Sequence, residues 1–512
     1  MSVKTPTLDQ LALLADQFGL DLSTDDLRSF QALMGGPLAS YQRLQALVEP
    51  SLPVNYPRAP GYRPGRDEDP LNAWVVKTAI KGAARGLLRG KRVAIKDNIC
   101  VAGVPMMNGT SVLEGYVPEI DATVVTRILD SGGEIAGKAD CESLCFSGGS
   151  HTTDNGPTLN PWDRTRTSGG SSAGSAALVA AGEVDMALGG DQGGSIRIPA
   201  SWCGIVGLKP THGLVPYTGA FPIETTIDHL GPMAATVADT ALLLEVIAGE
   251  DGLDPRQYSV RTQAYSKALE SGVKGLRIGL VPEGFAWPGS SEADVDAAVR
   301  KAGERYAALG AKVSTVSIPM HRDGVHIWNA IAIEGATSLM LKGNSMGTNW
   351  KGHYTTSLLD AFARGWQTRP NELSETTKLV LLTGEYMHTQ YHGRFYAKAQ
   401  NLARSLKAAY DAALTEVDLL LMPTLPMKAT KIPAPDASRE DYIARALEMV
   451  LNTAPFDVTG HPAVSVPCAL SKGLPVGAML VGKSYDEATV LRAAHALERS
   501  FDWKATGTKK RS

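Results

Sequence analysis

The chain lacks several features that would place it in a simple class of protein. It has no stretch of about 18 consecutive apolar residues, the length that a membrane-spanning helix needs. Its first residues, MSVKTPTLDQ, lack the apolar core of a signal peptide. The 50 Lys and Arg residues nearly balance the 53 Asp and Glu residues, so a net charge of −3 offers no basic surface to a nucleic acid. We therefore expect a cytoplasmic protein with no membrane or nucleic-acid partner.

Cysteine is also scarce. The five cysteines are an odd number without repeated spacing, which argues against a disulfide framework and is typical of a reducing compartment. Cys141 and Cys145 are four residues apart, a spacing that could put them on one face of a helix, but no histidine pair accompanies them, so they make a poor zinc site. We expect neither a metal nor a cofactor.

The chain does have the length and composition of a large globular protein. At 512 residues and 44% hydrophobic content it exceeds one typical domain and can bury a large core. Residues 1–89 are predicted to form an N-terminal segment in which helices are followed by a proline-rich connector, residues 53–70. This segment would either serve as a dimerisation arm, giving a homodimer, or simply cover the core.

Strand and helix patterns alternate from about residue 90. They predict an α/β fold in which helices sandwich a mixed, partly parallel sheet. We assign residues 90–289 and 434–512 to this core. Residues 290–433 are mostly helical and polar in pattern, which predicts a small inserted domain that covers the site.

A glycine-dense stretch over residues 169–201 is the most informative part of the chain. Its alanine-rich residues 173–182 predict a short helix, and residues 184–190 predict a buried strand. Ser171 and Ser195 would therefore occupy two tight turns with a helix and a strand between them. A serine beside free backbone N–H groups is the arrangement that acyl transfer needs, because the nucleophile and the oxyanion site then share a loop.

Other interpretations of the glycines fit less well. A flexible linker would not contain the apolar run LVAAGEVDMAL. A phosphate-binding P-loop requires a lysine after its glycines, and no lysine occurs between Arg166 and Lys209. The dinucleotide-binding fingerprint matches GGSSAG only loosely.

A serine nucleophile needs a base to take its proton. The chain has ten histidines, none in a recognisable catalytic motif. The other candidate is Lys96, at the end of the predicted strand RVAI, where it would lie in the core rather than on a solvated face. Spacing alone does not decide between them.

Together these motifs resemble the amidase signature family, serine hydrolases with a Ser–cis-Ser–Lys triad. The resemblance lies in GGSSAGSAALVAAG, ALGGDQGGSIRIPASWCGIVGLKPTHGLVP, VAIKDNI and GPTLNPWD, and it extends over nearly the whole chain. VPYTGAFPIETTIDHLGP and LNTAPFDVTGHP further resemble the wide-spectrum, often enantioselective amidases of nitrile-degrading bacteria. Two positions depart from the broader family: Ala173 replaces a common Gly, and Gln192 a common Thr.

The resemblance implies a role for each matched residue. Ser195 would be the nucleophile, Lys96 the general base, and Ser171 would pass the proton between them after a cis peptide that Gly170 eases. A neutral Lys96 implies activity that rises through neutral to alkaline pH. The oxyanion donors would be the backbone N–H groups of Gln192, Gly193, Gly194 and Ser195. The supporting residues would be Ser172 through a hydrogen bond, and Asp191 and Arg197 as an ion pair that holds the turn rigid.

The resemblance also points to an apolar acyl pocket, with Phe146, Trp328 and Val450 as candidate lining residues that could equally be plain core. Such a pocket suits small aliphatic or aromatic carboxamides, which would be hydrolysed to carboxylic acid and ammonia. The alternatives are hydrolysis of carbamate or anilide bonds on the same triad and, in another class, a subunit of a tRNA amidotransferase.

Overall fold

The computed structural model describes residues 3–507. Chain contacts divide the protein into two compact units, Met1–Pro53 and Val54–Ser512. The first unit contains the helices α1 (Leu8–Phe18), α2 (Thr24–Leu33) and α3 (Gly35–Gln45).

Local capping signals set the bounds of the first helices. Thr7 and Gln10 form a capping box at the start of α1, and Gly19 ends the helix with a φ of +66°, a conformation that glycine adopts without strain. The core of this unit is small, since it consists of Leu11, Ala15 and Leu27 with partly buried neighbours.

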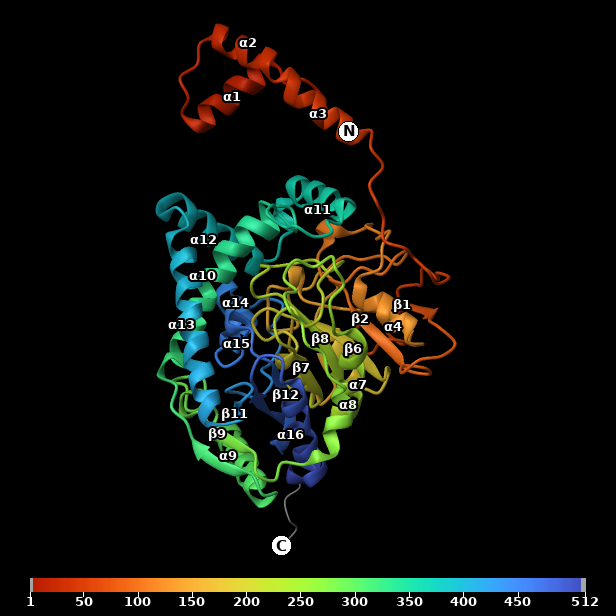
Figure 1. The fold of residues 1–512 in the computed structure, drawn as a ribbon, viewed down its shortest axis with the longest axis vertical. Helices are drawn as coiled ribbons and strands as arrows, with labels where there is room; N and C mark the ends of the chain where they lie inside the picture. The colour runs from red at the N-terminus through yellow and green to blue at the C-terminus, as the bar shows by residue number, and fades with distance from the viewer. Residues whose placement is uncertain (1–2, 508–512) are drawn as a thin grey trace. The chain divides into compact units, whose positions relative to one another are not determined.

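An 11-stranded sheet forms the centre of the second unit (Figure 1), with strand order β1-β3-β2-β6-β8-β7-β12-β13-β11-β9-β10. Its strands are β1 (Trp74–Lys81), β2 (Arg92–Lys96), β3 (Glu134–Ala139), β6 (Met186–Asp191), β7 (Val206–Lys209), β8 (His229–Ala234), β9 (Arg277–Leu280), β10 (Lys312–Thr315), β11 (Leu419–Pro423), β12 (Ala463–Ser471) and β13 (Leu474–Val481). A separate two-stranded sheet pairs β4 (Leu159–Asn160) with β5 (Asp163–Thr167).

The large sheet is mixed. β2 runs parallel to both β3 and β6, and β9 runs parallel to β10 and β11, whereas the central strands from β8 to β13 are antiparallel to their neighbours. A two-residue turn, Lys472 and Gly473, joins β12 to β13, and both residues have the positive φ that such a hairpin requires. The expected mixed, partly parallel sheet is therefore confirmed.

Helices flank this sheet. α5 and α6 contact each other and the strands. A second row of helices on the sheet consists of α4, α7, α16 and α9. α10, α12 and α13 pack side by side along one flank of the unit (Figure 1). The helices of this unit are α4 (Thr123–Asp130), α5 (Ala173–Ala180), α6 (Arg197–Cys203), α7 (Val237–Ile247), α8 (Tyr265–Ala268), α9 (Ala293–Ala308), α10 (Gly324–Ala336), α11 (Thr356–Thr368), α12 (Glu375–Tyr391), α13 (Arg394–Glu416), α14 (Arg439–Leu447), α15 (Ala454–Thr459) and α16 (Glu487–Ser500).

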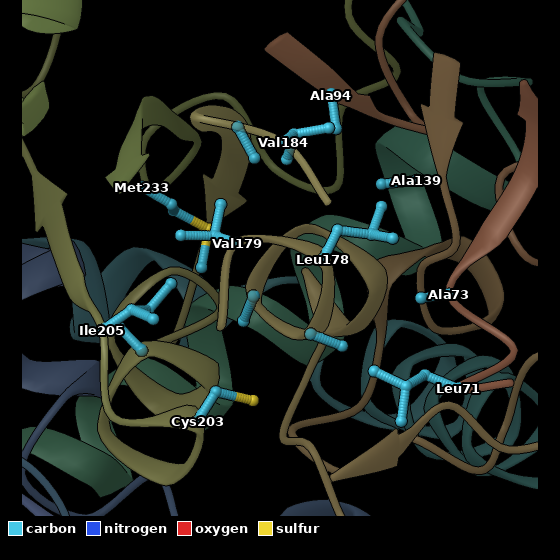
Figure 2. Packing of buried hydrophobic residues seen from close by; sticks show 14 of the residues in the cluster. Leu71, Ala73, Ala94, Ala139, Leu178, Val179, Val184, Cys203, Ile205 and Met233 are labelled. Carbon is cyan, nitrogen blue, oxygen red and sulfur yellow. The ribbon is translucent and has the colours of Figure 1, made fainter. Parts of the chain in front are cut away.

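The helix predicted between the two serines is α5, and it lies at the centre of a buried apolar cluster (Figure 2). Leu178 and Val179 of α5 pack in this cluster with Met233 of β8. The helix lies close to its neighbours because its residues are small: a Cβ added at Gly174 would lie 2.2 Å from the carbonyl oxygen of Ala73. This close packing fixes the position of the turn that precedes α5.

The structure places the boundaries of the parts elsewhere than the sequence predicts. The helices of the N-terminal segment end at Gln45, and β1, within the predicted segment 1–89, is a strand of the large sheet. Its sequence, WVVKTAIK, is rich in the β-branched and aromatic residues that favour strands. Residues 290–433 form no unit of their own, since β10 and β11 pair with β9 in the large sheet. Across the described residues, no helix is both long and apolar enough to cross a membrane.

Candidate active site

Lys96 ends β2, which lies between β3 and β6. Its side chain is fully buried, as expected of a lysine at the end of a core strand. Its side-chain nitrogen donates hydrogen bonds to the hydroxyl oxygen of Ser171 at 2.7 Å and to the carbonyl oxygen of Gly190 at 3.2 Å. A buried amine that contacts a serine hydroxyl is positioned for proton exchange with that serine.

Ser171 lies in the turn before α5, and the Gly170–Ser171 peptide bond is cis. The next residue ties this turn to the end of β6. The Ser172 hydroxyl accepts a hydrogen bond from the N–H of Gly190 at 3.2 Å and donates one to the carbonyl of the same residue at 3.2 Å. Ser172 N–H also donates to the carbonyl of Ser195 at 3.2 Å, which brings the two serine turns into direct contact.

Ser195 lies in the turn between β6 and α6, and it lines a cavity. The Asp191 carboxylate organises this turn by accepting the backbone N–H groups of Gly194 at 2.6 Å and Ile196 at 3.0 Å. Of the four oxyanion donors that the resemblance implies, Gly194 is thus already committed to Asp191. The N–H groups of Gln192, Gly193 and Ser195 have no hydrogen-bond acceptor within residues 3–507.

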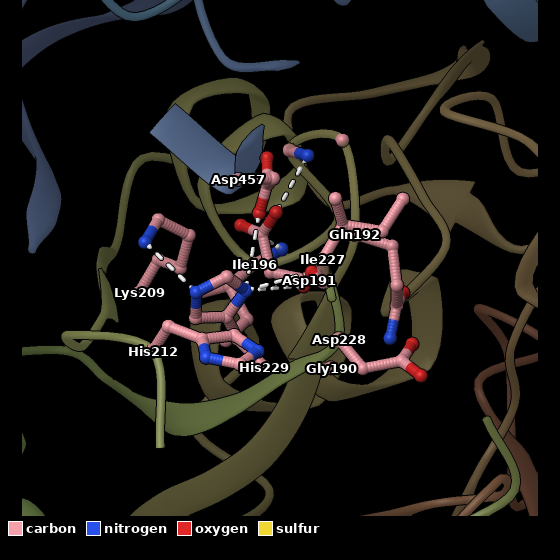
Figure 3. A network of polar contacts seen from close by, with 12 residues as sticks. Gly190, Asp191, Gln192, Ile196, Lys209, His212, Ile227, Asp228, His229 and Asp457 are labelled. Atoms are coloured by element: carbon pink, nitrogen blue, oxygen red, sulfur yellow. Dashed lines mark hydrogen bonds and ion pairs between the residues drawn. The ribbon is translucent and has the colours of Figure 1, made fainter. Parts of the chain in front are cut away.

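A buried ionic network stands behind the turn, and Figure 3 shows its two carboxylates, Asp191 and Asp457, close together. Arg197 donates to both carboxylate oxygens of Asp191 at 3.0 Å and to Asp457 at 2.7 Å, with all three side chains fully buried. Burial raises the pKa of Asp191, but the Arg197 guanidinium outweighs it and holds that pKa well below its usual range. Burial and the neighbouring Asp191 charge raise the pKa of Asp457. The expected Asp191–Arg197 ion pair is present, and it is fully desolvated.

Two more titratable groups extend the network. Lys209 lies 3.3 Å from Nε2 of His229, and Nδ1 of His229 lies 3.4 Å from Asp457 (Figure 3). Burial lowers the pKa of Lys209 to about 7, although the Asp457 carboxylate acts in the opposite direction. Burial and the Lys209 charge lower the pKa of His229 well below its usual value.

We expect the protein to gain stability, relative to a Lys209→Met variant, as the pH rises from about 7 to 9. An unfolded lysine keeps its proton up to a pH of about 10.4, whereas folded Lys209 loses it above about pH 7. The unfolded chain then binds more protons, so the free energy of unfolding rises by up to about 1.4 kcal/mol per pH unit. Urea titrations across this pH range measure the difference, with Lys301→Met on an exposed position of α9 as control. Parallel pH dependences of the wild type and Lys209→Met would contradict the assignment.

An apolar cavity opens beside Ser195, with about 380 Å³ of empty space including its mouth. The three predicted pocket residues, Phe146, Trp328 and Val450, all line it. The rings of Phe146 and Trp328 stack with their centroids 6.5 Å apart. The lining combines an apolar wall with a hydroxyl and free N–H groups at one end, which is the pattern of a small-molecule site.

Cys145 also lines this cavity, and it does not share a helix face with Cys141, although the spacing would allow it. Cys145 ends a single 3₁₀ turn in which Leu144 has a φ of +49°, and both sulfurs contact the side-chain oxygen of Asn108. Burial raises the pKa of the Cys145 thiol, but the contacts with Cys141 and with Lys96 outweigh it and lower the pKa to about 7.

Several residues that support the site could not be recognised from the sequence. Thr453 and Asp457 lie in LNTAPFDVTGHP, which carried part of the family resemblance, but their position in the sequence gives no indication of contact with the turn after β6. His229 likewise lies in a segment that carried the resemblance, FPIETTIDHLGP, and its position in the sequence gives no indication of its contacts. A buried polar residue is difficult to recognise from sequence when its partners lie some 40 to 260 residues away.

Known proteins match most of the length of the chain. The family model described as "Amidase" matches residues 72–491. The chain is 49% identical to an enantioselective amidase of Rhodococcus rhodochrous, over 96% of this chain and 95% of that protein. It is 39% identical to a glutamyl-tRNA(Gln) amidotransferase subunit of Methanosarcina mazei, over 83% of this chain and 88% of that one.

A solved structure shares the fold. The glutamyl-tRNA(Gln) amidotransferase subunit of Thermotoga maritima matches with a TM-score of 0.70 and 32% identity, over 84% of this chain and 88% of that one.

Proposed function

The chain belongs to the amidase signature family, and on that premise we propose that it hydrolyses small carboxamides to carboxylic acid and ammonia through an acyl-enzyme on Ser195. The observation that carries the proposal is the buried hydrogen bond of 2.7 Å between Lys96 and Ser171, next to a cavity lined by Ser195. This arrangement would supply a nucleophile, a proton carrier and a base close together.

The chemistry would proceed in two steps. The Ser195 oxygen bonds to the amide carbonyl carbon while its proton passes through the Ser171 hydroxyl to neutral Lys96. The carbon–nitrogen bond then breaks, and the proton returns to the departing nitrogen to give ammonia. Water cleaves the ester by the same proton route, releasing the acid and restoring Ser195.

The developing oxyanion needs donors that are already in place. We assign this role to the N–H groups of Gln192, Gly193 and Ser195, because each lacks another acceptor within the described residues. Asp191 would act indirectly, since its carboxylate shapes the turn. The apolar wall formed by Phe146, Trp328 and Val450 would receive the acyl group, which favours aliphatic and aromatic amides over charged ones.

A substrate panel tests this function. We expect the purified protein to release ammonia from aliphatic and aromatic carboxamides, with an acyl adduct visible by intact mass. A chiral amide belongs in the panel, because the Rhodococcus relative is called enantioselective. Amine release from aryl carbamates or anilides at a higher kcat/KM than ammonia release from any carboxamide would favour the alternative hydrolase.

The amidotransferase alternative predicts a different result. The two relatives of that name are subunits, so such a function calls for partner proteins. Steady turnover of simple amides by the purified chain alone would exclude it, whereas turnover that appears only with added partner proteins would support it.

The location of the protein in the cell and its oligomeric state are two further proposals. We propose a cytoplasmic homodimer in which the N-terminal helices mediate association. Phe18, Leu33 and Val48 of that unit are more than two-thirds exposed, and large exposed apolar side chains are typical of association surfaces. Sedimentation of the full chain measures the oligomeric state directly.

A further inference from the structure

Consecutive carbonyl groups of the turn after β6 are held by side chains from distant elements. The indole N–H of Trp328, on α10, donates to the carbonyl of Gln192 at 2.5 Å. The hydroxyl of Thr453, just before α15, donates to the carbonyl of Gly193 at 2.6 Å. Nδ1 of His229 makes a longer contact, 3.3 Å, with the carbonyl of Asp191 (Figure 3).

The contacts of Trp328 and Thr453 are the stronger of these three, because they are the shorter. A hydroxyl has a single hydrogen to donate, and the contact of Thr453 with Gly193 is shorter than its contact with Val450, 2.6 Å against 3.2 Å. Nδ1 of His229, in contrast, lies nearer to the carbonyl of Ile227, at 2.8 Å, than to that of Asp191. Trp328 and Thr453 are therefore the principal anchors of the turn.

Anchoring a carbonyl also orients an N–H group. A trans peptide unit is planar, and its C=O and the following N–H point in opposite directions. Holding the carbonyl of Gln192 therefore fixes the direction of the Gly193 N–H, which has no other acceptor within the described residues. The next peptide unit is fixed at both ends, by Thr453 at its carbonyl and by Asp191 at the Gly194 N–H.

Contacts with the glycines show how closely the anchors approach. A Cβ added at Gly193 would lie 2.6 Å from the Trp328 ring, and one added at Gly194 would lie 2.3 Å from the Thr453 hydroxyl. Both anchoring side chains therefore occupy space that any other residue type in the turn would need. The glycines and their anchors form one packed arrangement.

We propose that Trp328 and Thr453 are positioning residues for the oxyanion site: Trp328 directs the Gly193 N–H at the oxyanion, and Thr453 holds the adjoining peptide unit, so that the backbone is fixed on both sides of Gly193. Trp328 would also link the direction of this N–H to the fit of the acyl group. The proposal rests on the proposed function of the site. Trp328 forms part of the cavity wall next to Ser195 and stacks on Phe146. An acyl group that displaces the indole would tilt the peptide that carries the oxyanion donor, so poor fit lowers kcat as well as raising KM.

Thr453→Val tests the first anchor, since it removes the hydroxyl and keeps the shape. We expect kcat to fall by about 10- to 100-fold, less than the loss of a whole oxyanion donor, with KM changed by less than about threefold. Thr453→Ser restores the hydroxyl and should recover most of the rate. The matched control is Thr240→Val on α7, a buried threonine whose hydroxyl also donates to a backbone carbonyl. Equal losses in the Val and Ser variants would overturn the proposal.

Trp328→Phe tests the second anchor independently, because it keeps an aromatic wall and removes the indole N–H. The same fall in kcat is expected, and it should be larger for bulky acyl groups than for small ones. Trp162→Phe is the control, since that indole donates to a backbone carbonyl, that of Cys203, away from the cavity. A Trp328→Phe variant with wild-type kcat on every amide would overturn the proposal.

A fluorophosphonate probe separates this proposal from the proposed function. The Ser195 oxygen would bond to phosphorus, fluoride would leave, the serine proton would pass to Lys96, and a phosphonyl oxygen would take the oxyanion position. Labelling of the wild type at Ser195 together with slower labelling of both anchor variants supports the proposal. Labelling of Ser195 at equal rates in all of them overturns the anchoring role alone, whereas a wild type unlabelled at Ser195 overturns the function on which it rests.

Discussion

Ser195→Ala is expected to abolish amide turnover, with a loss of more than about 10⁴-fold in kcat, and to leave no acyl adduct. The reason is that no other hydroxyl in the turn after β6 would lie beside the free N–H groups of Gln192 and Gly193. Intact mass spectrometry during turnover detects the adduct, and ammonia release gives the rate. The fold should tolerate the change, because removing one small hydroxyl at a site 6% exposed creates almost no cavity.

A buried serine elsewhere in the same region provides the control. Ser175 lies in α5, and its hydroxyl donates to the carbonyl of Leu188 at 2.9 Å. Ser175→Ala should retain the acyl adduct and a rate close to that of the wild type. An adduct that persisted in Ser195→Ala would show that another group attacks the amide.

Lys96→Met is expected to lower kcat by about 10² to 10⁴-fold, the range that general base catalysis contributes. Methionine keeps most of the length of the side chain and removes the nitrogen that contacts Ser171. KM should change far less than kcat, because Lys96 does not line the cavity beside Ser195. Steady-state kinetics of ammonia release measure both constants.

A double variant makes the test sharper. If Lys96 and Ser171 act as one relay, Lys96→Met combined with Ser171→Ala should be little slower than either single variant, because residues that act as a unit are strongly non-additive. Losses that multiply would show that the two side chains contribute separately. A Lys96→Met enzyme with near-normal kcat would contradict the role of base.

Much of the catalytic core could be predicted from its residues. Local patterns were sufficient for α5, β6 and β2, since helix propensity and short apolar runs act within a few residues. The residue pattern singled out Lys96 and Ser171, the family resemblance supplied their expected roles, and the structure brings the two within hydrogen-bond distance. The spacing of the sequence left the choice of base between the histidines and Lys96 undecided, because spacing says little about which strands become neighbours.

The contacts that sequence reasoning missed are those between distant segments. Nothing in the spacing indicates that Thr453 would reach Gly193, or that the N–H of Gly194 would bind Asp191 instead of remaining free. The same holds for the boundary of the N-terminal part, since whether β1 joins the large sheet depends on its pairing with β3 rather than on its own pattern. Such pairings are set by tertiary packing.

Two residues that line the cavity beside Ser195 differ in what their substitution would change. Val450 touches the cavity with an aliphatic side chain that makes no hydrogen bond, so a swap there reshapes the space and leaves the peptide geometry alone. Trp328 is tied to the carbonyl of Gln192, so remodelling it would alter selectivity and speed together. A directed-evolution library for new acyl preferences is therefore better randomised at Val450, with the tryptophan held constant.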